Sequence, residues 1–235
     1  MWFSALCTVG LLCFLRSGES AVQPAAGEAE LPAGPYYVAL TFDDGPRRGT
    51  TDRLLDGLLE RDASATFFMV GEQIEQNQDL VLRMRQEGHQ TGNHTWSHCH
   101  LTENVTPALL EREVDRTAEL LSELTGPGSF WLRPPYGLLS PGAEEQVGVP
   151  LVKWSVDPRD WESRDKEKVV EAVLRDVKPN SIILLHDIYP SSVDAALEIV
   201  DVLQDRDYCF VTVEELLLLN GVTPQPGVMY RTGLG

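Results

Sequence analysis

The sequence predicts an α/β fold built on a mainly parallel sheet. From Tyr36 onward, short apolar runs alternate with amphipathic stretches, an order that is typical of strands connected by helices. The run at residues 181–185 is apolar on both faces, as are strands buried inside a barrel or a two-sided sheet. With 235 residues and 43% apolar content, the chain is long enough for one domain core, and a second large domain is not expected.

Seven strands are expected where short apolar runs are bounded by turn-forming residues. They cover residues 36–42, 65–70, 89–93, 130–132, 151–156, 181–185 and 208–212. Helices are expected between them, where apolar residues recur at helical spacing. They cover residues 51–61, 78–87, 106–125, 166–177, 193–206 and 213–219. In the third helix, Thr106 suits the N-cap and Pro107 the first turn.

The N-terminal residues are predicted to direct export. An apolar run at residues 6–15 is flanked by small residues, so we expect a signal peptide at 1–20. A membrane anchor is the alternative, but the run is shorter than the roughly 20 residues that span a bilayer. We expect a flexible linker at 21–35, the folded domain at 36–220, a C-terminal tail at 221–235 and no stable membrane span after processing. The protein is therefore expected to be secreted or associated with the cell envelope.

The charge of the chain excludes one class of partner. A formal net charge of -17 argues against nucleic acid, because such binding neutralises phosphates with basic side chains. Cys99 and Cys209 are the cysteines that remain after removal of the leader, and a single disulfide between them is left open. We expect a monomer.

Polar and catalytic residue types gather at the ends of the predicted strands. Each group follows a different strand, and the groups are Asp43 with Asp44, His94 with His98, residues 133–137, residues 157–161, and His186 with Asp187. In a parallel barrel the C-terminal ends of the strands meet on one face, where active sites are built. We therefore expect these groups to form one site.

The two histidines are candidate metal ligands. His94 and His98 are four residues apart, so on a helical turn they share a face and both present nitrogen to one ion. Alone, such a pair is more often two solvated histidines. With a carboxylate from another strand end, it makes an Asp-His-His set that suits catalytic zinc and also iron(II).

The remaining groups have structural and catalytic interpretations. Asp43 and Asp44 lie in a run of turn formers, yet near a metal one can ligate while the other takes a proton from water. Arg133 is the natural cation to pair with them. His186 is by default a core histidine, but a neighbouring carboxylate such as Asp160 would make it a proton donor.

Five motifs together resemble those of the NodB-homology polysaccharide deacetylases, carbohydrate esterase family 4. They are TFDDGP (41–46), HTWSH (94–98), RPPYG (133–137), DPRDW (157–161) and LLHD (184–187). The likeness covers residues 36–220 and depends on the whole set. It implies a distorted (β/α)7 barrel and a metal-dependent hydrolase that acts on a non-peptide C–N amide bond.

The resemblance also implies roles around a metal. Asp44, His94 and His98 resemble the metal ligands, with Zn2+ expected and Co2+ or another divalent ion as the alternative. Asp43 resembles the catalytic base, and Arg133 would hold it in place.

Further roles follow from the same resemblance. The backbone N–H of Tyr136 would stabilise the oxyanion, and Asp160 would orient His186, the general acid. Trp161 and Leu184, together with Tyr136, would contact the substrate around the acetyl group. One departure is the pair Cys99 and His100, where relatives often carry Pro-Asn, and we interpret both residues as bystanders to the site.

The implied reaction removes acetyl groups from N-acetylglucosamine units of a polysaccharide. Peptidoglycan and chitooligosaccharide are the expected substrates, and an N-acetylated polysaccharide or oligosaccharide is the expected partner. Acetylxylan esterase activity is an alternative, as is a catalytically silent carbohydrate-binding relative. An iron(II) oxygenase with the same three ligands is a further alternative.

Overall fold

A parallel sheet forms the centre of the structure, a computed structural model that describes residues 34–235. Its strand order is β3-β2-β1-β5, with β6 also paired to β1. The bounds are β1 Tyr36–Asp43, β2 Ala65–Met69, β3 Gln90–Asn93, β5 Ile182–His186 and β6 Tyr208–Phe210. The predicted signal peptide and nearly all of the predicted linker lie outside the described residues.

Isolated bridges continue the sheet into a distorted barrel. Asn93 bridges to Leu132, and Leu132 bridges to Leu151 at the start of β4, Leu151–Val152. After β4, Val156 bridges to Ile183 in β5, and all of these bridges are parallel. The predicted α/β fold with a parallel sheet in a distorted barrel is therefore confirmed.

Two predicted strands are shorter than expected. The expected strand at 130–132 contributes only the bridge residue Leu132, and the expected strand at 151–156 contributes Leu151–Val152 and the bridge at Val156. The sequence after Leu132 is Arg-Pro-Pro, and proline cannot donate to a strand ladder. The backbone instead turns here and carries side chains into the site.

A strand also lies where the sequence analysis expected only a tail. β7, Met229–Tyr230, pairs parallel to β4. Tyr230 is 3% exposed, and residues 34–235 cluster as one unit. The sequence analysis did not find this strand within the predicted tail at 221–235, because a two-residue strand has no periodicity that a sequence pattern can reveal.

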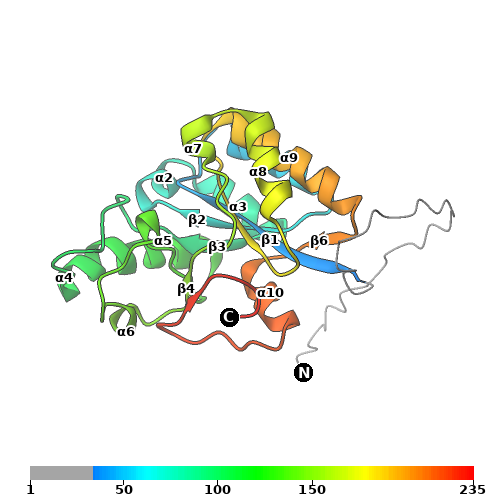
Figure 1. The fold of residues 1–235 in the computed structure, drawn as a ribbon. Coiled ribbons are helices and arrows are strands. Elements are labelled where there is room, and N and C mark those ends of the chain that lie inside the picture. Colours follow the sequence, from blue (N-terminus) through cyan, green and yellow to red (C-terminus); the bar gives the residue numbers. More distant parts are fainter. Residues whose placement is uncertain (1–33) are drawn as a thin grey trace, which may run out of the picture. The chain divides into compact units, whose positions relative to one another are not determined.

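The long predicted helices are present, and their bounds are α1 Thr51–Glu60, α3 Gln78–Gln86, α5 Arg116–Thr125, α8 Lys166–Asp176, α9 Pro190–Gln204 and α10 Val213–Leu219. In Figure 1, α7, α8 and α9 lie together above the strands, and α10 lies below them. The expected helix at 106–125 is divided into α4, Pro107–Leu110, a π-helical turn η1, Glu111–Asp115, and α5. Short elements that the sequence did not reveal are α2 Gly71–Gln76, η2 Pro135–Gly137, α6 Glu144–Val147 and α7 Asp160–Ser163.

The main core lies between the sheet and the helices on its outer side. Leu40, Phe42 and Phe67 are buried together with three leucines of α1, Leu54, Leu55 and Leu58. Burial of such side chains contributes most of the stabilisation. Among residues 34–235, no helix is long and apolar enough to cross a bilayer. Cys99 and Cys209 are not joined in a disulfide.

Candidate active site

A cavity of about 370 Å3 opens at the C-terminal ends of the strands. It is lined by Asp43, Asp44, His94, His98, Tyr136, Trp154, Asp157, Trp161, Leu184, His186 and Tyr189. Each of the five predicted groups supplies at least one lining residue, and His186 does so from the end of β5. The expected convergence on one site is therefore observed. Another cavity, of about 330 Å3 near the start of β3, contains none of the predicted site residues.

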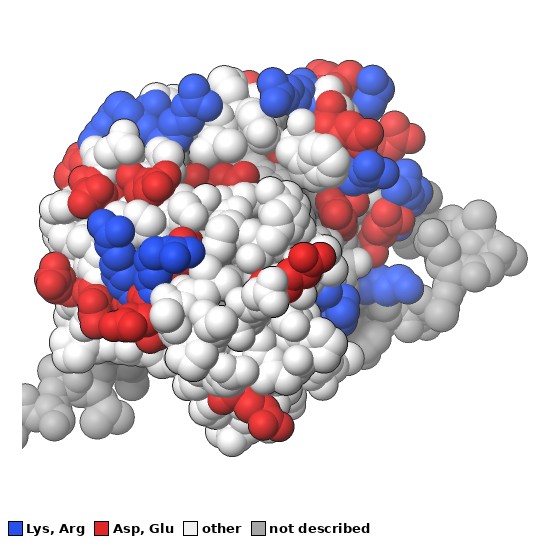
Figure 2. All heavy atoms as spheres, turned by 90° about the vertical axis from the view of Figure 1, so that its left-hand side faces the viewer, with Lys and Arg blue, Asp and Glu red and all other residues white. Residues whose placement is uncertain are grey.

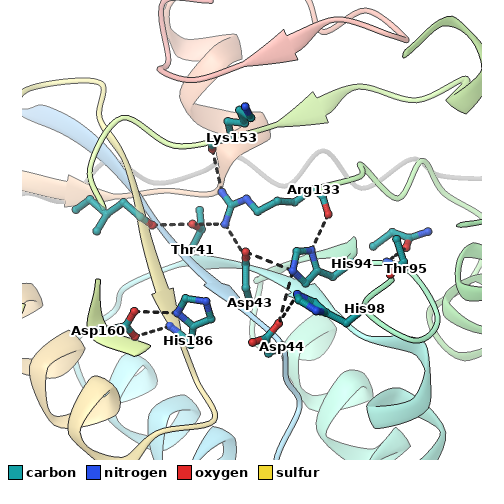
Figure 3. A network of polar contacts seen from close by, with 12 residues as sticks. Thr41, Asp43, Asp44, His94, Thr95, His98, Arg133, Lys153, Asp160 and His186 are labelled. Carbon is teal, nitrogen blue, oxygen red and sulfur yellow. Dashed lines mark hydrogen bonds and ion pairs between the residues drawn. The ribbon is translucent and has the colours of Figure 1, made fainter. Parts of the chain in front are cut away.

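Asp44, His94 and His98 form a compact cluster in this cavity (Figure 3). Their candidate ligand atoms all lie within 4.8 Å of one another. Asp44 Oδ1 is 3.3 Å from His98 Nε2 and 3.6 Å from His94 Nε2. The same oxygen is buried without a hydrogen-bond partner. A buried carboxylate oxygen facing two ring nitrogens fits a divalent cation.

The rings of both histidines are prepared to ligate. His94 Nδ1 lies 2.6 Å from the carbonyl oxygen of Arg133, and because a carbonyl only accepts, Nδ1 is assigned the proton and donates. This leaves the lone pair of Nε2 facing Asp44, an arrangement usual for metal-ligating histidine. Burial, with a smaller contribution from His94, lowers the pKa of His98 and favours its neutral ring.

The expectation that these histidines share one helical turn was wrong. Thr95 and His98 have φ values of 66° and 58°, so the backbone visits the left-handed region twice within the segment. Asn93 Oδ1 accepts a hydrogen bond from Thr95 N at 2.9 Å, which stabilises the first of these conformations. The two rings therefore converge through an irregular segment that starts at the end of β3.

Asp43 is held by a buried cation. Arg133 Nη1 donates to Asp43 Oδ1 at 2.7 Å and to Thr41 Oγ1 at 2.8 Å, and Nη2 donates to the Lys153 carbonyl at 3.0 Å. Arg133 is fully buried, and this burial lowers its pKa against the opposing effect of Asp43. The other Asp43 oxygen, Oδ2, lies 3.6 Å from His94 Nε2. The fork of Arg133 thus fixes one carboxylate oxygen and leaves the second facing the cluster.

His186 and Asp160 form the second charged pair. His186 Nδ1 donates to Asp160 Oδ1 at 2.8 Å. The other oxygen, Oδ2, accepts from His186 N at 2.8 Å and from Ser192 Oγ at 2.6 Å. Burial acts to lower the pKa of His186, but the hydrogen bond and charge of Asp160 outweigh it, and the pKa rises to about 9. The imidazolium form is therefore favoured at neutral pH.

Tyr136 forms part of the cavity wall and is held by two rings. It has a φ of 59° and is 54% exposed. The His100 ring stacks on it at 4.1 Å between centroids with an interplanar angle of 11°, and His98 meets it edge-on at 4.9 Å. His100 is not a lining residue of the cavity, but it contacts Tyr136, which is. Cys99 is absent from the cavity lining.

Some residues of the site were missed by the sequence analysis. Asp157 lines the cavity from the predicted group at 157–161, whereas Trp154 and Tyr189 line it from outside the five motifs. Their positions next to motif residues were a usable signal. Ser192, which is fully buried behind Asp160, gave no signal, because a serine in the first turn of a helix is ordinarily a capping residue.

Asp187 supports the turn that carries Asp44. Its carboxyl is buried and accepts a hydrogen bond from Thr51 Oγ1. Burial raises its pKa to about 7. A Cβ at Gly45 would lie 2.3 Å from the Asp187 carboxyl oxygens, so this turn requires glycine for close approach.

The sequence is similar to a known protein family and to proteins that are named as deacetylases. A model of the polysaccharide deacetylase family matches residues 31–148. The peptidoglycan-N-acetylmuramic acid deacetylase PdaC of Bacillus subtilis is 39% identical over 76% of this chain. That alignment covers 38% of PdaC, so the chain spans well under half the length of this relative. A peptidoglycan-N-acetylglucosamine deacetylase of Bacillus cereus is 35% identical over 80% of this chain and 91% of its own length.

Solved structures share the fold. The family 4 acetyl xylan esterase of Clostridium thermocellum, in complex with a cobalt ion, superposes with a TM-score of 0.78 at 34% identity. The superposition covers 83% of this chain and 98% of that one. The names of these three relatives specify different substrates. Together with the family match, they show that the chain belongs to the polysaccharide deacetylase family.

Proposed function

We propose that this protein is a metal-dependent deacetylase that removes acetyl groups from N-acetylglucosamine units of a polysaccharide. The observation that carries the proposal is the placement of an ion-paired carboxylate, Asp43, and a protonated imidazole, His186, on one cavity beside Asp44, His94 and His98. Hydrolysis of an amide needs a base for the attacking water and an acid for the leaving amine. The cavity holds a candidate for each.

The metal would be held by Asp44, His94 and His98. A divalent ion at such a site supplies Lewis-acid chemistry, which polarises a carbonyl oxygen and lowers the pKa of water. Two nitrogen ligands and one oxygen ligand suit zinc, and cobalt is the natural substitute. The cobalt-containing relative supports this choice of metal class.

Asp43 is the proposed base. Its Oδ1 is engaged by Arg133, while Oδ2 is directed toward the cluster. A carboxylate fixed in this way is pre-oriented to accept the proton of the attacking water. As the tetrahedral centre forms, negative charge develops on the former carbonyl oxygen, which the backbone N–H of Tyr136 would stabilise.

His186 is the proposed acid. With its pKa raised to about 9, it carries a proton at neutral pH and can give it to the nitrogen as the C–N bond breaks. The products would be acetate and a free amine on the sugar. Leu184, which is 3% exposed, and Trp161, which is 43% exposed, would contact the acetyl group and the sugar.

Peptidoglycan or chitooligosaccharide is the proposed substrate, in preference to acetylxylan. The predicted leader and the names of the bacterial relatives support a substrate in the cell envelope. Figure 2 shows a face with a broad central area free of Lys, Arg, Asp and Glu, although the net charge is -17. A neutral sugar polymer is compatible with such a face. We further propose that the mature protein is secreted or envelope-associated, monomeric and without affinity for nucleic acid.

The direct test is an acetate-release assay with peptidoglycan glycan strands, chitooligosaccharides and acetylxylan. We expect acetate from an N-acetylated substrate, loss of activity after chelation, and recovery with zinc or cobalt. Release from acetylxylan alone would establish the esterase alternative. Binding of the glycans without acetate release would establish a silent binding protein, and a requirement for oxygen and a cosubstrate would establish an oxygenase.

A further inference from the structure

The segment between the two proposed metal-ligating histidines, His94 and His98, packs against one continuous helical stretch. It is contacted by residues of η1 and the first residue of α5, which follow each other in the chain. η1 is a π-helical turn, and such turns occur rarely and often at functional sites. The position of this π-helical turn against the segment is therefore consistent with a functional role.

Glu113 is the main contact. Its side chain enters the protein from η1, and the residue is 3% exposed. Glu113 Oε2 accepts from the backbone N–H of Ser97 at 3.0 Å and from Ser97 Oγ at 2.9 Å. The negative charge of Glu113 also contributes, after burial, to raising the pKa of the nearby Cys99 thiol. Ser97, the residue immediately before His98, is thus bonded to one buried side chain through both its backbone N–H and its hydroxyl.

Neighbouring residues of the same turn hold other parts of the segment. Asn93 Nδ2 donates to the Val114 carbonyl at 2.8 Å. The guanidinium of Arg116 lies 3.3 Å from the centre of the Trp96 ring, which is 8% exposed. Contacts from η1 and α5 therefore reach the segment both before His94 and between the two histidines.

The contacts from η1 and α5 hold a segment whose backbone conformation at His98 is intrinsically unfavourable. His98 has a φ of 58°, which is uncommon for a residue other than glycine and persists only when the surroundings impose it. The hydrogen bonds that Glu113 accepts from Ser97 hold the residue immediately before His98. Loss of these bonds would let His98 leave the left-handed region and move its ring away from Asp44.

We infer that Glu113 is a positioning residue that holds His98 in the geometry required to bind the metal. The inference rests on the proposed metal site but not on the proposed reaction. Groups behind metal ligands typically change metal affinity by about 10- to 100-fold when they are removed. Glu113 would act in this way through the backbone of its neighbours rather than through the imidazole itself.

The test compares metal affinity in three variants of the full chain. Glu113→Ala removes the carboxylate, and Glu113→Gln keeps its shape while removing its charge. Glu111→Gln is the matched control, because Glu111 lies in the same turn and is exposed. Zinc affinity is measured by competition with a chromophoric chelator, and thermal unfolding of the metal-free proteins shows whether each variant is folded.

We expect both Glu113 variants to bind zinc more weakly by about tenfold or more, with the larger loss in Glu113→Ala, and the control to equal the wild type. If Glu113→Ala does not fold, Glu113→Gln alone decides the outcome. Wild-type zinc affinity in a folded Glu113→Gln variant would overturn the inference. Because affinity is measured without substrate, a wild-type protein that binds zinc but releases no acetate would refute the proposed function and leave this test intact.

Discussion

Two ion pairs of the same kind border the cavity in opposite orientations. In the first, Arg133 is 2.7 Å from Asp43, the cation is fully buried and the carboxylate lines the cavity. In the second, His186 is 2.8 Å from Asp160, the carboxylate is fully buried and the cation lines the cavity. Figure 3 shows both pairs beside the cluster of Asp44, His94 and His98.

The opposite orientation of the two ion pairs explains how one cavity can present a carboxylate and an imidazolium together. In each pair the buried partner is fixed by further hydrogen bonds, from Arg133 to Thr41 and from Ser192 to Asp160. The partner that faces the cavity keeps an atom for chemistry. In the proposed mechanism, the carboxylate paired with Arg133 is the base and the imidazole paired with Asp160 is the acid.

The largest effect is expected from breaking the first pair with Arg133→Met. This change leaves the buried Asp43 carboxylate without its cation. Removal of one partner of a buried pair typically costs about 3–5 kcal/mol. We therefore expect the free energy of unfolding, measured by urea denaturation at neutral pH, to fall by about that amount.

The control for this experiment is an exposed pair. Arg48 lies 2.6 Å from Asp79, and both side chains are more than half exposed. Arg48→Met should change the unfolding free energy little, because exposed ion pairs contribute little. Equal effects of the Arg48 and Arg133 variants would show that the buried pair has no special role.

The second expected effect concerns turnover. His186→Ala removes the proposed proton donor, and kcat should fall by about 10²- to 10⁴-fold. Zinc affinity should stay near that of the wild type, because His186 is not among the clustered ligand residues. Steady-state kinetics and a zinc competition assay measure the two quantities. Unchanged kcat would remove His186 from the mechanism.

The smallest expected effect comes from the ring that stacks on Tyr136. His100→Ala removes a contact of a type worth about 0.5–1.5 kcal/mol. If that energy holds the Tyr136 backbone in place, kcat/KM should fall by up to about tenfold. His100→Phe keeps a stacking ring and should retain most of the activity. A loss in His100→Phe equal to that in His100→Ala would show that stacking is not the cause.

The sequence was sufficient for the main parallel sheet and for the five groups of residues that converge on the cavity. Buried strands such as β5 have apolar runs that mark them directly. Residues at their C-terminal ends must lie on one face, whatever the details of packing. For this reason Asp43 and His186 could be assigned to one site before any coordinates were considered.

The sequence was not sufficient where the geometry depends on irregular backbone or on distant contacts. The spacing of His94 and His98 suggested a helical turn, but left-handed residues produce the convergence. Ser192 contacts Asp160, 32 residues earlier, and Glu113 contacts Ser97, 16 residues earlier, each from a separate helix. Local patterns carry no information about such contacts.

We conclude that the two ion pairs are oriented oppositely, with His186 as the cation that faces the cavity. The most direct test of this conclusion is the pH dependence of kcat/KM in the wild type and in Asp160→Asn. The folded protein raises the pKa of His186 to about 9, above its ordinary value of about 6.5. The acid is therefore present at neutral pH and is lost as the pH rises through this value. A divalent cation near Asp44 would offset part of the contribution of the other carboxylates, so the basic limb of the profile is expected at or below about pH 9.

Because the asparagine side chain carries no charge, Asp160→Asn should move this limb toward lower pH and leave the acidic limb in place. A basic limb that does not move would contradict the account.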